Sequence, residues 1–200
     1  MKRLLAVFLT LGALAWAGKD AKQHGKLKPG LYAVFDTSEG VITAELYEKY
    51  TPLAVNNFVG LAMGTKPWKD PKTGKFVRRP MYNGVTFHRI IREEMIQTGD
   101  PSGTGAHDCG ITLRDEFLPG LRFDRAGRLA VANTGKPDSG ACQFFFTEQP
   151  VPRWNGAYTI FGQVVEGQDV VHNINVKQLI GEKPAVPVIL KSVSLERVPK

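Results

Sequence analysis

An apolar stretch between Phe87 and Asp100 contains an arginine and a glutamine that packing does not require. If its two ends form strands, whose side chains alternate between faces, Met95 and Gln97 share one face and Arg89 lies on the neighbouring strand across a short polar turn. A guanidinium is always charged and offers several N–H donors to a bound polar group. Taken singly, however, an arginine in such a strand more often forms a salt bridge, a methionine more often belongs to the hydrophobic core, and a glutamine is more often exposed to solvent. These residues therefore form either a binding site or the wall of a β-barrel that carries polar side chains without a binding role.

Three further segments follow in order: residues 129–134 (LAVANT), 140–146 (GACQFFF) and 154–162 (WNGAYTIFG). With the first stretch, they resemble the cyclophilin family of peptidyl-prolyl cis/trans isomerases, whose hallmarks are an FHR run followed by M-x-Q-x-G-D, an ANxG, a QFF and a VFG-like strand. The resemblance covers about residues 30 to 198, and the ordered series is more specific than any single motif. It implies a mainly β fold, a closed eight-stranded antiparallel β-barrel flanked by two α-helices. It also implies isomerase activity without a cofactor or a metal.

An X-Pro amide resists rotation by about 18–20 kcal/mol, so a catalyst must favour the twisted amide over both planar forms. This requires an apolar pocket for the proline ring, a donor for the nitrogen lone pair that reappears on twisting, and polar groups that hold the neighbouring peptide. The resemblance implies that Arg89 is the catalytic arginine, that Gln97 orients it and binds a substrate carbonyl, and that Asn133 binds substrate backbone. The implied substrate-binding residues are Met95 and Phe145 as floor and wall of the proline pocket, Ala132, Thr134 and Gln143 in the adjoining groove, and Glu94, Trp154 and Tyr158.

Three positions depart from the family pattern. Glu94 stands in place of the usual pocket phenylalanine, the indole of Trp154 comes one place late after Arg153, and Tyr158 replaces a frequent histidine. If Glu94 faces inward within reach of Arg89, the pocket becomes narrower and partly acidic, and activity falls. If instead Glu94 turns into solvent, Trp154 fills the space. The alternative function is therefore a cyclophilin-like peptide-binding module or chaperone with weak or no isomerase activity.

Periodicity and turn residues predict the elements that position these side chains. A β-hairpin is expected over residues 31–36 and 41–47, and a helix from Thr51-Pro52 to Gly64, with Thr51 as its capping residue. A polar surface loop is expected over 65–80, and a loop over 100–110 in which Gly103 and Gly105 allow close backbone approach. The other predicted elements are strands at 84–91, 95–98, 128–132, 143–147, 159–164 and 186–197 and a second helix at 167–176.

The N-terminus predicts export. Lys2-Arg3, an apolar run from Leu4 to Ala15 and the small residues of Ala15-Trp16-Ala17 are typical of a secretory signal peptide over residues 1–17. The apolar run is short for a membrane anchor, the alternative considered. A flexible leader is expected over 18–28 and the cyclophilin-like domain over 29–200, in the periplasm or, alternatively, secreted. The expected partners are proline-containing peptides and unfolded exported proteins, bound by a monomer without stable membrane insertion.

Composition bounds these expectations. Two hundred residues with 42% hydrophobic content fit one globular domain, and 21 glycines and 13 prolines favour strands and turns. Loss of the signal lowers the net charge from +7 to +5, because two basic residues and no acidic residue are removed, and this mild, spread excess argues against nucleic-acid binding. Histidine spacing indicates no metal site.

Cys109 and Cys142 permit one disulfide; their spacing alone does not show that they meet, although the resemblance places both segments beside the groove. Two separate thiols are the alternative.

Overall fold

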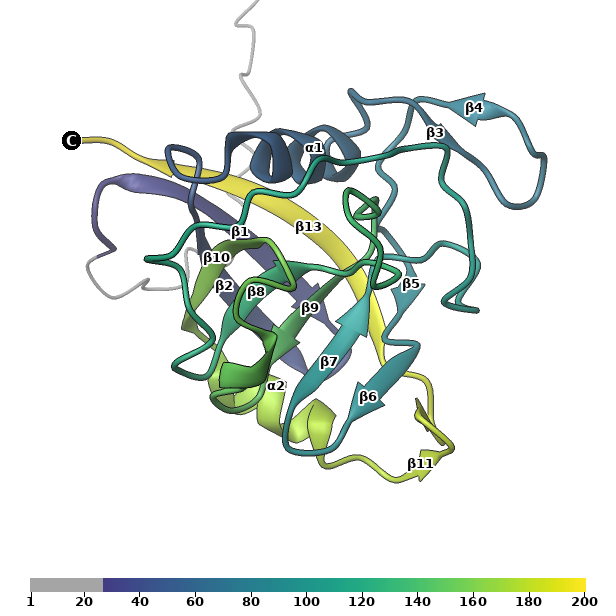
Figure 1. The fold of residues 1–200 in the computed structure, drawn as a ribbon. Helices are drawn as coiled ribbons and strands as arrows, with labels where there is room; N and C mark the ends of the chain where they lie inside the picture. The colour runs from purple at the N-terminus through teal and green to yellow at the C-terminus, as the bar shows by residue number, and fades with distance from the viewer. Residues whose placement is uncertain (1–26) are drawn as a thin grey trace, which may run out of the picture.

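The computed structural model describes residues 27–200, so the predicted signal peptide and nearly all of the leader lie outside the described residues. The chain forms a curled antiparallel sheet of nine strands, with the helices α1 (Pro52–Ala62) and α2 (Gln168–Asn175) at opposite ends of it (Figure 1). The strands of this sheet, in spatial order, are β5 (Val85–Thr86), β13 (Ile189–Val198), β1 (Gly30–Thr37), β2 (Gly40–Leu46), β10 (Ile160–Glu166), β8 (Arg128–Val131), β9 (Phe144–Thr147), β7 (Met95–Thr98) and β6 (Arg89–Ile91). The mainly β prediction with two helices is confirmed.

The two faces of the sheet bury different side chains because neighbours along a strand point in opposite directions. Ile96 of β7 and Phe144 and Phe146 of β9 belong to the main core, where the ring of Phe146 packs on Phe35 and the ring of Phe144 packs on Phe58. The alternate residues of the same strands lie on the outer face, where they join a second, smaller apolar cluster of Met95, Phe123, Ala130, Phe145, Val151 and Ile160. The candidate site is built on this second cluster.

The hydrogen-bonded strand order is open among residues 27–200, which corrects the prediction of a closed eight-stranded barrel. The predicted strand 84–91 is split at Phe87 and His88: β5 pairs with β13, whereas β6 pairs with β7. Around this break, backbone hydrogen bonds run to segments outside the named strands. Phe87 N–H donates to Val188 O, and Ile90 N–H in β6 donates to Glu182 O. One bent segment therefore supplies both edges of the sheet, and the result is a curled half-barrel.

The helix α1 begins at the predicted proline, but Thr51 does not cap it with its side chain. Its first free N–H groups, those of Leu53 and Ala54, donate instead to the two carboxylate oxygens of Glu116, at 3.1 and 2.9 Å. A distant acidic residue thus supplies the cap, which also suits the positive end of the helix dipole.

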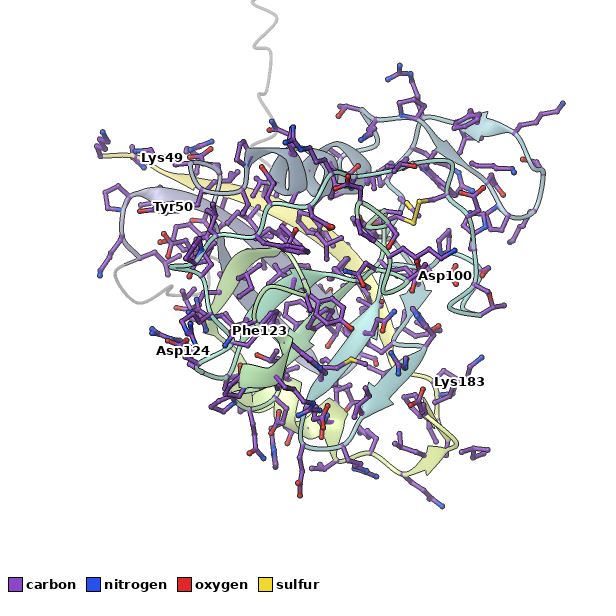
Figure 2. The ribbon with its side chains drawn as sticks, viewed as in Figure 1. Lys49, Tyr50, Asp100, Phe123, Asp124 and Lys183 are labelled. Carbon is purple, nitrogen blue, oxygen red and sulfur yellow. A yellow bond between two sulfur atoms is a disulfide. The ribbon has the colours of Figure 1, made fainter. Side chains whose placement is uncertain are left out.

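Two small hairpins were not predicted as strands. The expected loop at 65–80 contains β3 (Trp68–Lys69) paired with β4 (Phe76–Val77), and Trp68 is buried with its indole N–H bonded to Arg79 O. A second hairpin, β11 (Leu179–Ile180) with β12 (Lys183–Pro184), lies beside β6, and Lys183 marks its place in Figure 2. This second hairpin contributes directly to the site.

Candidate active site

Strand register places the predicted site residues in one row across the outer face. Arg89 on β6 lies opposite Gln97 on β7, Gln97 lies opposite Phe145 on β9, and Phe145 lies opposite Ala130 on β8. Met95 occupies the neighbouring row, opposite Ile91. The sheet therefore brings together the guanidinium, the amide and the apolar residues that the sequence places far apart.

These residues line a cavity of about 290 Å³. Met95 and Phe145 are buried at its base, and the ring of Phe145 meets Trp154 and Tyr158 edge-on at 5.4 and 5.2 Å between ring centroids. Beneath them Phe123, labelled in Figure 2, stacks on Phe145 at 6.1 Å. An apolar floor with aromatic walls suits a small apolar ring, and its complete lining is Arg89, Ile91, Glu94, Met95, Gln97, Ala132, Asn133, Phe145, Arg153, Trp154 and Tyr158.

Arg89 stands at the edge of this pocket and is held from outside it. Its Nε donates to Glu182 Oε2 at 2.7 Å, and the backbone carbonyl of Glu182 accepts from Ile90 N–H, also at 2.7 Å. Among residues 27–200 this is the only hydrogen bond of the guanidinium, so both terminal nitrogens are free to donate to a ligand. Arg89 is thus salt-bridged, as expected for a single arginine of this kind, and it also lines the pocket.

Gln97 bonds to Gln143 and not to Arg89. Its Nε2 donates to Gln143 Oε1 at 2.8 Å. The sequence predicted instead that the Gln97 amide orients the Arg89 guanidinium. The same Gln143 oxygen accepts from His88 Nε2 at 3.1 Å, because a carbonyl oxygen can only accept. His88 was predicted to be structural, and it supports the groove by fixing Gln143; burial lowers the pKa of His88 below its usual value.

Glu94 lines the pocket but pairs with Arg153, which neither sequence alternative foresaw. The carboxylate is attached to the turn between β6 and β7, and the guanidinium comes from the short 3-10 helix η1 (Pro152–Trp154) on the opposite wall. Arg153 Cζ also lies 5.4 Å from the centre of the Trp154 ring. The expectation that Glu94 competes for Arg89 is therefore wrong, as is the expectation that it turns away from the pocket.

The turn that carries Glu94 is held by α2. The left-handed backbone of Glu93, with φ of 61°, closes a three-residue hairpin loop. Buried Asn175 accepts from Glu93 N–H at 3.0 Å and donates to Ile91 O at 2.9 Å. Arg92 reaches back to Asn175 O at 2.7 Å. Polar contacts from the helix therefore determine where Glu94 and Met95 stand.

A second hollow of about 320 Å³ adjoins the pocket and shares Gln97, Ala132 and Asn133 with it. Its wall includes Gln143, whose Nε2 donates to Gly105 O at 3.0 Å, and Thr134, whose N–H donates to Ser139 Oγ at 3.1 Å. Asn133 donates through Nδ2 to Ala157 O at 2.8 Å, which fixes its own backbone at the junction of the two hollows. Ala132, Thr134 and Gln143, the predicted groove residues, all line this second hollow.

The loop after β7 is shaped by the buried carboxylate of Asp100, labelled in Figure 2. Its oxygens accept from Ser102 N–H at 2.7 Å and Gly105 N–H at 2.6 Å. Burial raises the pKa of Asp100, but the hydrogen bond from the Ser102 hydroxyl, at 2.7 Å, together with these two backbone bonds outweighs that effect, and the pKa lies below its usual value. Gly105, at φ +82°, approaches His88 closely, since a Cβ there would lie 3.2 Å from His88 Cδ2. The predicted close approach at Gly105 is present.

Cys109 and Cys142 form a disulfide, drawn as a yellow bond in Figure 2, and both line the second hollow. Tyr82 donates its buried hydroxyl to Cys142 O at 3.0 Å, and Lys69 N–H donates to Cys109 O at 2.9 Å. The disulfide prediction is confirmed, and the alternative of two separate thiols is excluded.

Fold and site together define a curled β-sheet protein whose outer groove suits an extended polypeptide carrying one small apolar ring. A family model described as cyclophilin type peptidyl-prolyl cis-trans isomerase/CLD matches residues 32–195. Peptidyl-prolyl cis-trans isomerase A of Mycobacterium tuberculosis is 40% identical over 166 residues, which cover 82% of this chain and 91% of that protein. Peptidyl-prolyl cis-trans isomerase B of Streptomyces anulatus is 39% identical over 170 residues, with 83% and 97% covered.

A crystal structure of a cyclophilin type peptidyl-prolyl cis-trans isomerase from Cryptosporidium parvum superposes with a TM-score of 0.72 at 30% identity, covering 84% of this chain and 98% of that one. A second structure of the same protein, in the presence of the dipeptide Ala-Pro, gives 0.71 at 29% identity, with 84% and 99% covered. The chain therefore belongs to the cyclophilin-type peptidyl-prolyl cis-trans isomerases, and its activity is the rotation of X-Pro peptide bonds.

The residues around the pocket that the sequence did not predict are Ile91 and Arg153 in its lining, Phe123 under its floor, Glu182 beside Arg89, Asn175 under the hairpin turn and His88 as the partner of Gln143. Two of them had a local signal, because His88 directly precedes Arg89 in the FHR run and Arg153 directly precedes the late Trp154. Within residues 27–200, no group of three or more His, Cys, Asp or Glu side chains is arranged to hold a metal ion. Neither described helix has the length and apolar character needed to cross a bilayer.

Proposed function

We propose that Arg89 is the catalytic residue of this isomerase and that its free terminal N–H groups donate to the prolyl nitrogen as the amide twists. The observation that carries this proposal is the position of Arg89: it lies at the edge of an apolar pocket, anchored at Nε and unpartnered at both terminal nitrogens among the described residues. Twisting returns the lone pair to the prolyl nitrogen, so a donor there stabilises the twisted form more than either planar form.

The other site residues hold the substrate. Met95 and Phe145 would receive the pyrrolidine ring, with Trp154 and Tyr158 as walls. Gln97 and Asn133, at the junction with the adjoining hollow, would bind the peptide on one side of the proline. Ala132, Thr134 and Gln143 would line the path of that peptide. A proline-containing peptide is the substrate class, which the neighbour solved in the presence of Ala-Pro supports.

The alternative of a peptide-binding module with little catalysis rested on a pocket that Glu94 makes narrower and partly acidic, and on competition between Glu94 and Arg89. Because Glu94 pairs with Arg153, the second of these grounds is removed and Arg89 keeps its terminal nitrogens for the substrate. Isomerase activity is therefore the function that the geometry favours.

The decisive experiment is a protease-free isomerisation assay on a short X-Pro peptide. Arg89→Ala should remove most of the rate and retain the native circular dichroism spectrum, because the side chain is partly exposed and makes one ion pair with an exposed partner. Arg125→Ala is the matched control, an arginine that pairs with Asp124 outside the pocket. Unchanged catalytic efficiency in a folded Arg89→Ala protein would remove Arg89 from the mechanism.

We further propose that the protein works as a monomer in an export compartment, where it accelerates the folding of exported clients. The signal-like residues 1–17 support this, and so does the disulfide, since disulfides persist in oxidising compartments. Expression with the native leader in a bacterial host, followed by mass spectrometry, should yield a periplasmic or secreted chain that begins at Gly18. A cytosolic chain that retains Met1 would contradict export.

A further inference from the structure

The pair of Glu94 and Arg153 is the part of the pocket that the isomerase mechanism leaves without a task. It joins the two walls of the pocket, one on the β6–β7 hairpin and the other on η1. Gln97, Ala132 and Asn133 mark the opening toward the adjoining hollow, and neither member of the pair lines that hollow. A peptide with its proline in the pocket and one arm in the hollow therefore has Glu94 and Arg153 beside the proline and not beside that arm.

The two members of the pair are unequally available to such a peptide. The Arg153 side chain is 61% exposed, whereas that of Glu94 is 26% exposed. One terminal nitrogen of Arg153 contacts Glu94 and its face lies over Trp154, and the remaining N–H groups have no partner among residues 27–200. Because a guanidinium carries five donors, Arg153 can bind a second carboxylate without releasing the first.

The charged groups around the pocket are balanced in number but not in exposure. Its lining contains two arginines, Arg89 and Arg153, and a single acidic residue, Glu94; Glu182, which neutralises Arg89, lies outside the lining. With Glu182 included, two arginines face two carboxylates, so the greater exposure of Arg153, and not a net charge, favours a substrate carboxylate. A substrate carboxylate is attracted to this pocket, whereas a substrate ammonium would have to reach the less exposed Glu94.

We propose that Arg153, held over the pocket by Glu94, makes this isomerase select prolines that have an acidic residue as a direct neighbour. The substrate class is thus narrowed from X-Pro peptides in general to segments with Glu or Asp beside the proline. This inference rests on the proposed placement of the proline in the pocket. It adds a specificity-determining residue and leaves the chemistry to Arg89.

The test compares isomerisation of the peptides Ala-Xaa-Pro-Yaa, in which Glu, Gln or Lys is placed at one of the two positions beside proline and Ala at the other. For the native protein, kcat/KM should be about twofold to fivefold higher with Glu than with Lys at one of these positions, the range expected of a partly exposed charge pair. The Glu-to-Lys ratio should move toward one as the salt concentration rises to about 0.5 M, because screening weakens the attraction.

Three variants make the test specific. Arg153→Gln should bring the ratio to about one, and the charge-swapped protein Glu94→Arg/Arg153→Glu should reverse it, because the more exposed member is then acidic. Arg125→Gln is the matched control, since Arg125 is 62% exposed and also pairs with a carboxylate, that of Asp124, away from the pocket. It should keep the native ratio.

Equal rates for the Glu, Gln and Lys peptides in the native protein would overturn the selectivity, as would a Glu preference that survives in Arg153→Gln. The Gln peptides separate this failure from failure of the proposed function, because they report isomerase activity without a substrate charge. If no peptide is isomerised, the proposed function fails, and calorimetric dissociation constants for the same peptides then decide whether the acidic preference exists in binding.

Discussion

Removal of the disulfide should cost this protein a large part of its stability. Cys109 and Cys142 are 33 positions apart, and in the chain-entropy model a closed loop of this size stabilises the folded state by about 4 kcal/mol. For a domain of this length, 1 kcal/mol corresponds to about 2–4 °C in Tm. The double variant Cys109→Ala/Cys142→Ala should therefore melt about 8–16 °C below the oxidised native protein. Alanine is chosen because both positions are buried, and serine would bury an unpaired hydroxyl.

The assay is thermal unfolding followed by circular dichroism, with and without dithiothreitol. Reductant should lower the Tm of the native protein toward that of the double variant and should leave the double variant unchanged, which controls for effects of the reagent itself. Because both cysteines line the hollow beside the proline pocket, the same variant should also raise the KM for longer peptides more than it lowers kcat. A Tm within 2 °C of the native value would refute the reasoning about loop entropy.

Three further outcomes follow from the contacts of the site. Glu182→Gln should lower kcat about twofold to fivefold with little change in KM, since Arg89 loses its anchor; an unchanged kcat would show that Arg89 needs none. Asn175→Ala should lower the free energy of unfolding by about 2–4 kcal/mol in urea titrations, because buried partners of the β6–β7 turn lose their hydrogen bonds. Burial lowers the pKa of His88 in the folded protein, so on acidification the His88 imidazole becomes protonated at a higher pH in the unfolded chain than in the folded one. Stability should therefore fall as the pH drops below about 6.5, a fall that should flatten in His88→Gln.

Much of the fold was predictable because its signals are local. The hairpin of β1 and β2 has alternating residues around a short turn, and α1 begins at a proline and ends two residues before Gly64, so few competing structures fit these segments. The open strand order depends instead on contacts between distant segments, such as Ile90 with Glu182. The buried Trp68 in a polar, turn-rich stretch escaped for the same reason, since its partners are set by tertiary packing.

The candidate site shows the same division between positions and partners. Strand alternation and family order were enough to bring Arg89, Gln97, Met95 and Phe145 to one face, where the structure has them. The partners of the charged residues were not predictable, because Glu182 lies 93 positions from Arg89 and its side chain arrives on a hairpin that has no periodic signal. Side-chain pairing across a pocket is determined by the assembled fold.

One sequence signal for such a pairing did exist. Two departures from the family pattern carry opposite charges, Glu94 in place of an aromatic residue and Arg153 just before the late Trp154. An isolated carboxylate in the wall of an apolar pocket would be unfavourable, since burial penalises an unpaired charge. A second, opposite departure that reaches the same pocket removes that penalty, and Arg153 does so from the facing wall. Considered together, the two departures predict an ion pair across the pocket; considered singly, each suggested only a damaged proline pocket. The pair leaves Arg89 free for the substrate, which is why a pocket with a glutamate in it remains compatible with isomerase chemistry.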